Sequence, residues 1–313
     1  MSRWTAADIP DQTGRTAIIT GANSGLGFRT AEALARAGAV VVLACRDASR
    51  GAGALDRLRG SVPEAADRVS LRPLDLADLD SVCAFAAGTE GGVDLLINNA
   101  GIMALPSRRT TAQGFEAQVG TNHLGHFALT GLLLPKLLER AGSRVVTLSS
   151  GVHKFGRISQ LDDLQSERKY GAWTTYSLSK LANVLFFTEL DRRLRAAGAS
   201  TISVGAHPGY AATNLQIAGP QADGVSLPAR VMALANPILG QSDRMGALPT
   251  LRAATAPDVE GGEFYGPSGL GEQRGHPKRV KYSAAGRDGA AARRLWADSE
   301  RLTGVTGPLP VGS

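Results

Sequence analysis

The chain has 313 residues, of which 43% are hydrophobic and 20% are charged, and this composition excludes a disordered or collagen-like chain. Its formal net charge is +6, but the basic residues are scattered and lack interleaved aromatic residues, so no nucleic-acid partner is predicted. One basic cluster near the C-terminus is interpreted as a solvated tail, with a polyanion site as the alternative; it consists of Arg274, Lys278, Arg279 and Lys281.

Cysteine content and hydropathy exclude further classes. Cys45 and Cys83 have no short spacing to each other or to a histidine, so neither a disulfide framework nor a metal site is indicated. The sequence has no apolar N-terminal segment and no run of about 18 apolar residues. We therefore expect a cytoplasmic protein with no metal and no stable membrane insertion.

From residue 15 onward, short apolar runs alternate with longer segments whose apolar residues recur every three or four positions. This alternation is typical of βαβ units, in which helices cover both faces of a parallel sheet. The predicted strands span residues 16–20, 40–45, 69–74, 93–97, 144–148, 201–204 and 263–265. The clearest predicted helices span residues 25–37, 49–59, 78–87, 122–140 and 174–197.

We therefore predict one α/β domain over residues 1–313, a single Rossmann-type doubly wound domain with a seven-stranded parallel sheet in the order 3-2-1-4-5-6-7, flanked by helices on both faces. Residues 14–266 would form the catalytic core, and residues 267–313 a C-terminal tail with a terminal helix. Segments 151–173 and 210–245 are long excursions after strands, where open α/β sheets bind ligands, and we expect 210–245 to be a substrate lid. Its apolar residues favour a lipophilic substrate, unless they only pack the lid on the core.

A glycine-rich turn, spaced Gly21-x-x-x-Gly25-x-Gly27, follows the first strand and opens the first helix. Its glycines lack Cβ atoms where a pyrophosphate would approach the backbone, and the helix N-terminus supplies free N–H groups. Turn chemistry alone could use the same residues, but the position after the first strand predicts a dinucleotide site. The binding residues would be Gly21, Asn23, Ser24, Gly25, Leu26 and Gly27.

Arg46 stands at the end of the second strand, where a carboxylate would bind the adenosine ribose of NAD(H). An arginine there would instead pair with a 2′-phosphate, which favours NADP(H) over NAD(H). The alternatives are that Asp47 turns toward the ribose or caps the next helix.

After the third strand, Asp75 and Leu76 could meet the adenine, or Asp75 could be a helix N-cap. After the fourth strand, the small and amide residues suit close packing against a cofactor or simply a tight turn; they are Asn98, Asn99, Ala100 and Gly101.

Tyr176 and Lys180 lie four residues apart in a predicted helix, so their side chains leave the same face one turn apart. A fixed cation near a phenol favours phenolate and lowers the pKa of the phenol, which would make Tyr176 a general acid/base. A coincidental surface pair would have the same spacing, so the pair gains meaning only from the motifs around it.

Together these motifs resemble the short-chain dehydrogenase/reductase superfamily over residues 14–265, in family order. The matching motifs are Thr20-Gly21-x-x-x-Gly25-x-Gly27, Asn98-Asn99-Ala100-Gly101, Asn122, Ser149-Ser150, Tyr176-x-x-x-Lys180 and Pro208-Gly209-x-x-x-Thr213. Residues 43–46, 122–127, 207–209 and 294–300 are similar to the retinol-dehydrogenase and WW-domain-oxidoreductase-like branch.

The resemblance implies an oxidoreductase that moves a hydride between NADP(H) and an alcohol or carbonyl substrate. In it, Ser150 would hydrogen-bond the substrate oxygen, Tyr176 would transfer the proton, and Lys180 would lower the Tyr176 pKa and bind the nicotinamide ribose. Asn122 would hold a water that relays protons to Lys180. Pro208, Gly209 and Thr213 would contact the cofactor, with Thr213 at the nicotinamide carboxamide.

Several alternatives stay open at this point. Ser149 could be the working hydroxyl, Asn122 could only cap a helix, and Thr213 could be a plain loop residue. The histidines are interpreted as packed or solvated rather than catalytic. The chain could also be a dinucleotide-sensing or scaffold protein without turnover, or an epimerase or dehydratase relative. A homodimer through the helices at 122–140 and 174–197 is compatible with the resemblance, although the C-terminal tail could cover one of those faces.

Overall fold

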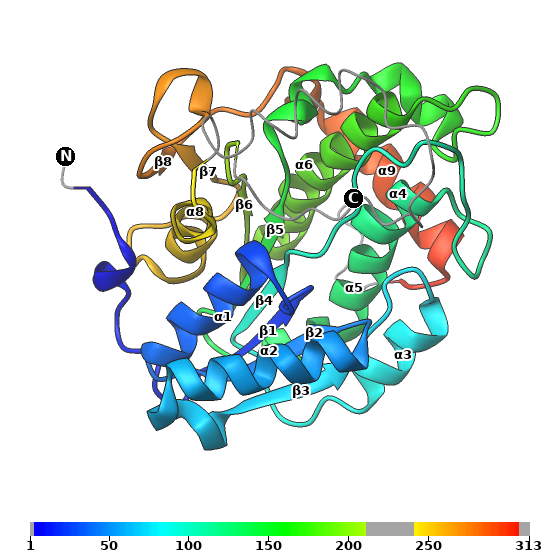
Figure 1. The fold of residues 1–313 in the computed structure, drawn as a ribbon. Helices are drawn as coiled ribbons and strands as arrows, with labels where there is room; N and C mark the ends of the chain where they lie inside the picture. Colours follow the sequence, from blue (N-terminus) through cyan, green and yellow to red (C-terminus); the bar gives the residue numbers. More distant parts are fainter. Residues whose placement is uncertain (1–2, 211–240, 307–313) are drawn as a thin grey trace.

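A mostly parallel sheet forms the centre of the computed structural model, which describes residues 3–210 and 241–306 (Figure 1). Its strands lie in the order β3-β2-β1-β4-β5-β6-β7-β8, and β1 to β7 are parallel. The predicted α/β class and the order of the first seven strands are confirmed. The strands are β1 (Thr16–Thr20), β2 (Val40–Cys45), β3 (Val69–Pro73), β4 (Leu95–Asn98), β5 (Arg144–Leu148), β6 (Ile202–Ala206), β7 (Phe264–Pro267) and β8 (Pro277–Arg279).

The eighth strand corrects the prediction of a seven-stranded sheet and of a solvated basic tail. β8 pairs antiparallel with β7, with Arg279 opposite Tyr265, and Arg279 Nη1 lies 2.8 Å from Glu263 Oε1. The side chains of Lys278 and Arg279 are exposed as expected, but their backbone belongs to the sheet. Three residues that begin with a proline carry no apolar periodicity, so only the pairing with β7 reveals this edge strand.

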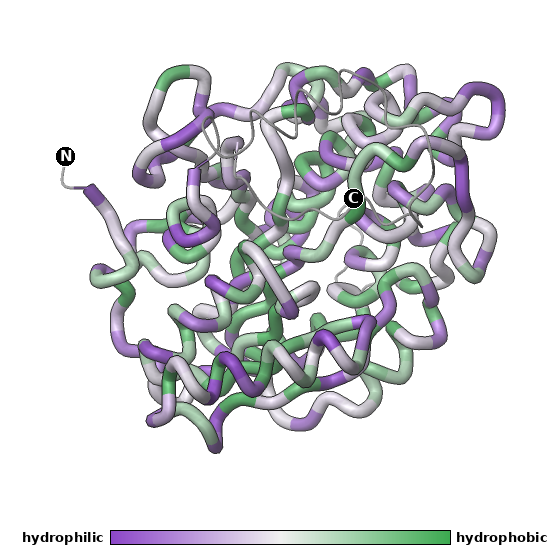
Figure 2. Tube along the Cα trace, in the orientation of Figure 1, coloured by the Kyte–Doolittle hydropathy of each residue, from purple (hydrophilic) through white to green (hydrophobic). Residues whose placement is uncertain are grey.

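Helices cover both faces of the sheet and create two separate cores (Figure 1). One face is covered by α1 (Gly25–Arg36), α2 (Ala48–Ser61) and α8 (Asp243–Thr255), and the other by α3 (Leu79–Ala87), α5 (Gly125–Leu138) and α6 (Ala172–Ala196). Because successive strand residues point to opposite faces, Ile19 packs in the first core and Ile18 in the second. Figure 2 shows hydrophobic colour along the central strands, which both cores cover.

The remaining elements are short or peripheral. Helix α9 (Gly289–Thr303) packs on α5 and α6, where Trp296 stacks on Phe186 at 6.0 Å and meets Phe127 at 5.0 Å between ring centroids. The predicted excursion 151–173 contains two short 3₁₀ helices, η4 (Gly151–Phe155) and η5 (Ile158–Asp163). Most of the predicted lid, including Thr213, lies outside the described residues. Across residues 3–210 and 241–306, no helix is long and apolar enough to cross a membrane.

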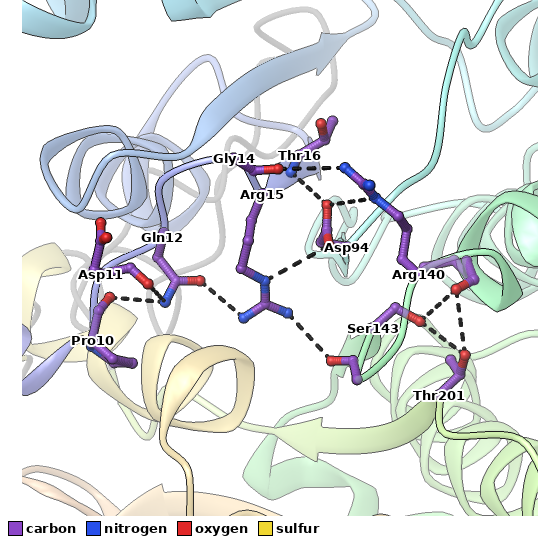
Figure 3. A network of polar contacts seen from close by, with 12 residues as sticks. Pro10, Asp11, Gln12, Gly14, Arg15, Thr16, Asp94, Arg140, Ser143 and Thr201 are labelled. Atoms are coloured by element: carbon purple, nitrogen blue, oxygen red, sulfur yellow. Dashed lines mark hydrogen bonds and ion pairs between the residues drawn. The ribbon is translucent and has the colours of Figure 1, made fainter.

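Asp94 joins the starts of several strands at the edge opposite the expected site (Figure 3). Its carboxylate accepts a hydrogen bond from the Thr16 amide at 2.8 Å and pairs with Arg140 at 3.4 Å and Arg15 at 3.9 Å. Its side chain is only 10% exposed, so the two guanidinium groups compensate for the lost hydration of the carboxylate.

We predict that Asp94→Ala lowers the free energy of unfolding by about 2–4 kcal/mol, because it leaves two guanidinium groups and one amide without their partner. Asp298→Ala, which removes exposed ion pairs on α9, is the matched control and should cost less than about 1 kcal/mol. Urea denaturation measures both. Equal effects of the two substitutions would contradict a structural role for Asp94.

Candidate active site

The predicted catalytic residues meet at the carboxyl edge of the sheet. Tyr176 and Lys180 lie one turn apart on α6, and Ser150 follows β5. Asn122 lies in a π-helical turn, η3 (Gly120–Leu124), which joins α4 (Ala117–Val119) to α5. A Cβ atom added to Gly101 would lie 3.4 Å from Lys180 Nζ and 3.1 Å from Asn122 Oδ1, so the turn after β4 approaches the same point.

Tyr176 is buried and its phenol lies within reach of the Ser150 hydroxyl. Burial raises the pKa of Tyr176 to about 12, and the nearby Ser150 hydroxyl opposes that rise. The lower pKa expected from Lys180 is not found, because the ammonium faces the ring at 5.8 Å from its centroid and the loss of water dominates. At neutral pH the phenol is therefore protonated and can serve as a proton donor.

Lys180 is a buried cation with few partners. Burial lowers its pKa to about 8, and its Nζ donates one long hydrogen bond of 3.4 Å to the Leu148 carbonyl oxygen. A charged group in such a place is destabilising unless a ligand or water solvates it.

The two serines at the end of β5 have different roles. Ser149 Oγ donates to the Lys180 carbonyl oxygen at 2.8 Å, so its hydroxyl holds α6 against the strand. Ser150 caps η4, where its Oγ accepts from the Val152 amide at 3.4 Å, and it is the hydroxyl beside Tyr176.

Asn122 lies inside a continuous helical segment and therefore does not cap α5. Its Oδ1 accepts from the Ile102 amide at 2.8 Å, while its Nδ2 donates to the Ile102 carbonyl and to Ser179 Oγ, both at 2.9 Å. The side chain thus joins the segment after β4 to α6 beside Lys180. π-helical turns are often associated with functional sites.

A buried histidine connects this group to the glycine-rich turn, which sequence reasoning did not anticipate. His126 Nδ1 lies 3.0 Å from the Asn122 carbonyl oxygen, so it carries the proton, and Nε2 accepts from Thr20 Oγ1 at 2.9 Å. Thr20 Oγ1 in turn accepts from the amides of Asn99 and Ala100 at 2.9 Å each. The sequence led only to the interpretation that His126 is packed or solvated, because nothing local shows that β1 lies beside α5.

The glycine-rich turn leaves the start of α1 open. Gly21 and Gly25 have φ of +65° and +54°, and Ser24 occupies the N-cap position without a side-chain hydrogen bond to the helix. A Cβ atom on Gly27 would lie 2.6 Å from the Gly21 carbonyl oxygen, so a glycine is needed for the helix to sit this close to the turn. The carbonyl of Asn23 accepts from Arg57 at 3.0 Å, and Leu26 is half-buried.

The residues predicted to contact the adenosine half of the cofactor are either exposed or already used within the fold. Arg46 is exposed at the end of β2, and no described residue forms an ion pair with it. Asp47 instead caps α2 through the Arg50 amide at 2.9 Å, which was its alternative role. Asp75 accepts from the Ala77 amide at 2.9 Å but is not a helix N-cap; Asp78 caps α3. Leu76 is buried in the second core.

The predicted cofactor-binding residues after β4 and β6 form hydrogen bonds and close contacts within the protein. Asn98 is fully buried and donates to Thr130 Oγ1 at 3.0 Å, so its amide faces α5, whereas Asn99 Nδ2 donates to the Thr20 carbonyl at 2.7 Å. Pro208 accepts a hydrogen bond from Gln241 through its carbonyl oxygen at 2.6 Å. Gly209 has φ +67° and packs so closely on the Gln273 carbonyl that an added Cβ would lie 2.5 Å away.

Comparison with known proteins identifies the family. A model of the short chain dehydrogenase family matches residues 15–223. Human retinol dehydrogenase 13 is 42% identical over 309 residues, which cover 96% of this chain and 87% of the relative. Human retinol dehydrogenase 12 is 40% identical over 297 residues, which cover 93% and 87%.

Solved structures agree with the sequence relatives. The crystal structure of an uncharacterized protein from Mycobacterium paratuberculosis is 45% identical, with a TM-score of 0.80, and the match covers 98% of this chain and 100% of that one. Salutaridine reductase from Papaver somniferum, at 21% identity and a TM-score of 0.60 over 80% of this chain and 99% of its own, shares the fold. The resemblance drawn from the motifs is confirmed: this chain belongs to the short-chain dehydrogenase family of NAD(P)-using hydride-transfer oxidoreductases, in its retinol dehydrogenase-like branch.

Proposed function

We propose that this protein is an NADP(H)-dependent oxidoreductase that acts on an alcohol or carbonyl centre of a small lipophilic substrate, with Ser150, Tyr176, Lys180 and Asn122 as its site. The observation that carries the proposal is the buried Tyr176 phenol, which lies within reach of the Ser150 hydroxyl and one helical turn from a buried Lys180. An acid, a second hydroxyl and a cation at one strand end are the groups that carbonyl reduction requires.

In the reductive direction, the Ser150 hydroxyl donates a hydrogen bond to the substrate carbonyl oxygen. Tyr176, which stays protonated because its pKa is raised to about 12, gives its proton to the oxygen as negative charge develops there. Lys180 stabilises the resulting tyrosinate, and Asn122 holds the segment after β4 beside it. When bound, the nicotinamide supplies the hydride.

The residues around the glycine-rich turn fit a phosphorylated dinucleotide. The uncapped N-terminus of α1 presents amide groups and a positive dipole end to a pyrophosphate. Arg46, exposed and without an ion pair in the described residues, would hold a 2′-phosphate, while Asp47 is occupied at the start of α2. Of the remaining predicted contacts, Gly101 and the Pro208-Gly209 pair would lie toward the nicotinamide and Asp75 toward the adenine.

The competing scaffold hypothesis leaves the buried lysine unexplained. Burying Lys180 with one long hydrogen bond destabilises the fold, and a scaffold that binds neither a dinucleotide nor a substrate gains nothing from it. A dinucleotide sensor could use Lys180 to bind the ribose, but it would have no use for the Tyr176 phenol beside it. Residues 1–313 would form one domain, because β8 and α9 of the C-terminal region pack into the sheet and its helices. Since α9 covers part of α5 and α6, a homodimer through those two helices would have to accommodate it.

We predict that Tyr176→Phe lowers kcat for any accepted carbonyl by about 10²–10⁴-fold, because the proton donor is lost while the ring remains. Tyr170→Phe is the matched control, since that phenol donates to the Leu105 carbonyl at 2.6 Å and should change kcat little. Stopped-flow measurement of NADPH oxidation gives kcat for both. A Tyr176→Phe protein with normal turnover would refute the mechanism.

Arg46→Ala should raise the KM for NADPH by about 10-fold or more and leave the KM for NADH nearly unchanged, because only NADPH carries the 2′-phosphate. Arg50→Ala, one turn into α2 and paired with Asp47 at 3.6 Å, is the control. Steady-state kinetics with both cofactors decides the question: an equal change for the two cofactors rules out the phosphate contact.

Lys180→Met should abolish turnover yet raise the free energy of unfolding at pH 7 by about 1–3 kcal/mol. The Lys180 pKa is lowered from 10.5 to about 8 on folding, so the cost of burying the cation is fully present below pH 8. It disappears as the pH rises from 8 to 10.5, because the folded protein releases the proton first. Urea denaturation at pH 7 and pH 10 tests this; a variant less stable than wild type by the same amount at both pH values would contradict it.

A further inference from the structure

Two exposed aromatic side chains among the described residues belong to elements that carry the proposed site, Phe155 on η4 and Trp173 on α6. Among the described residues, the most exposed large apolar side chains are Leu270 (96%), Phe155 (75%) and Trp173 (48%). Phe155 ends the helix that Ser150 caps, and the segment that carries Leu270 is joined to this helix by the ion pair between Glu272 and Lys154 at 2.9 Å. Of these side chains, the one that also contacts a proposed site residue is the candidate for a binding contact.

Trp173 is the member of this group that touches the proposed proton donor. Its ring centroid lies 6.1 Å from that of Tyr176, with an interplanar angle of 78°, which is an edge-to-face contact. The two residues are three positions apart on α6 and therefore share one face of the helix. Since Trp173 is about half exposed, part of its ring is left free beside the phenol.

The backbone that carries Trp173 is fixed by polar side chains on both sides. Gln118, which is fully buried, donates from Nε2 to the Ala172 carbonyl oxygen at 3.1 Å, and Gln160 Nε2 donates to the Thr174 carbonyl at 3.2 Å. These hydrogen bonds fix the first turn of α6, while about half of the Trp173 ring remains exposed to water. A side chain that is fixed and exposed in this way is preorganised to contact a ligand.

We propose that the free face of the Trp173 indole forms one wall of the substrate site and packs on the apolar carbon skeleton next to the reacting carbonyl. This assignment rests on the proposed function, because it takes Tyr176 as the proton donor. Trp173 is then a specificity-determining residue: it favours substrates with an extended apolar group and does not take part in proton or hydride transfer.

The test compares propanal with octanal as substrates, with NADPH saturating. Trp173→Ala should lower kcat/KM for octanal by about 10–100-fold, mostly through KM, and for propanal by less than about 3-fold, since only octanal reaches across the indole. Trp173→Phe should retain most of the octanal activity. Leu138→Ala is the matched control, because that side chain is 37% exposed at the end of α5, away from Ser150. An equal loss for both aldehydes, or no loss for octanal, overturns the proposal.

Binding of octan-1-ol, measured by calorimetry on the full chain, separates this inference from the proposed function. One outcome is that wild-type protein reduces neither aldehyde while Trp173→Ala, unlike Leu138→Ala, weakens octan-1-ol binding by 10-fold or more. That outcome contradicts the proposed function and supports the role of Trp173 in the substrate site. If octan-1-ol binds to wild type and Trp173→Ala equally, or to neither, Trp173 does not line the substrate site. This conclusion holds whether or not the aldehydes are reduced.

Discussion

The polar connection between the end of β5 and the middle of α6 determines where the site can form. Ser149 Oγ donates to the Lys180 carbonyl at 2.8 Å, and Asn183 Nδ2 donates to the Leu148 carbonyl at 2.9 Å. These two hydrogen bonds fix the position of α6 relative to the end of β5. Because Ser150 is the next residue after Ser149, they also fix the distance between its hydroxyl and the Tyr176 phenol.

A second set of hydrogen bonds joins this catalytic half to the dinucleotide half. Thr20 at the end of β1 accepts two amides from the turn after β4 and donates to His126, whose other nitrogen donates to the Asn122 carbonyl. Burial lowers the pKa of His126 to about 4, so the ring is neutral at physiological pH and can donate from one nitrogen and accept at the other. The two halves of the site are therefore held by one buried chain of polar groups, which costs little only because its members are paired.

The site also concentrates the groups that weaken the fold. Lys180 is buried with one long hydrogen bond, the first turn of α1 lacks a side-chain cap, and Trp173 leaves much of its ring in water. Away from it, three acidic side chains have their partners: Asp78 and Asp288 cap their helices, and Asp94 has partners on three sides. Such a contrast is expected where binding and chemistry, rather than folding, require a residue.

The sequence by itself determined the α/β class and the spacing of Tyr176 and Lys180, because parallel strands and helices have distinct apolar periods. Through the doubly wound pattern that this alternation is typical of, the sequence also predicted the order of the first seven strands. It could not reveal β8, which has no such period and exists only by pairing with β7. Tertiary structure alone decided that Ser149 holds α6 while Ser150 faces the phenol, that Asn122 joins two segments rather than capping a helix, and that burial outweighs the cation in setting the Tyr176 pKa. Those outcomes depend on which segments meet across the sheet and on how much water they exclude, and neither is encoded in local spacing.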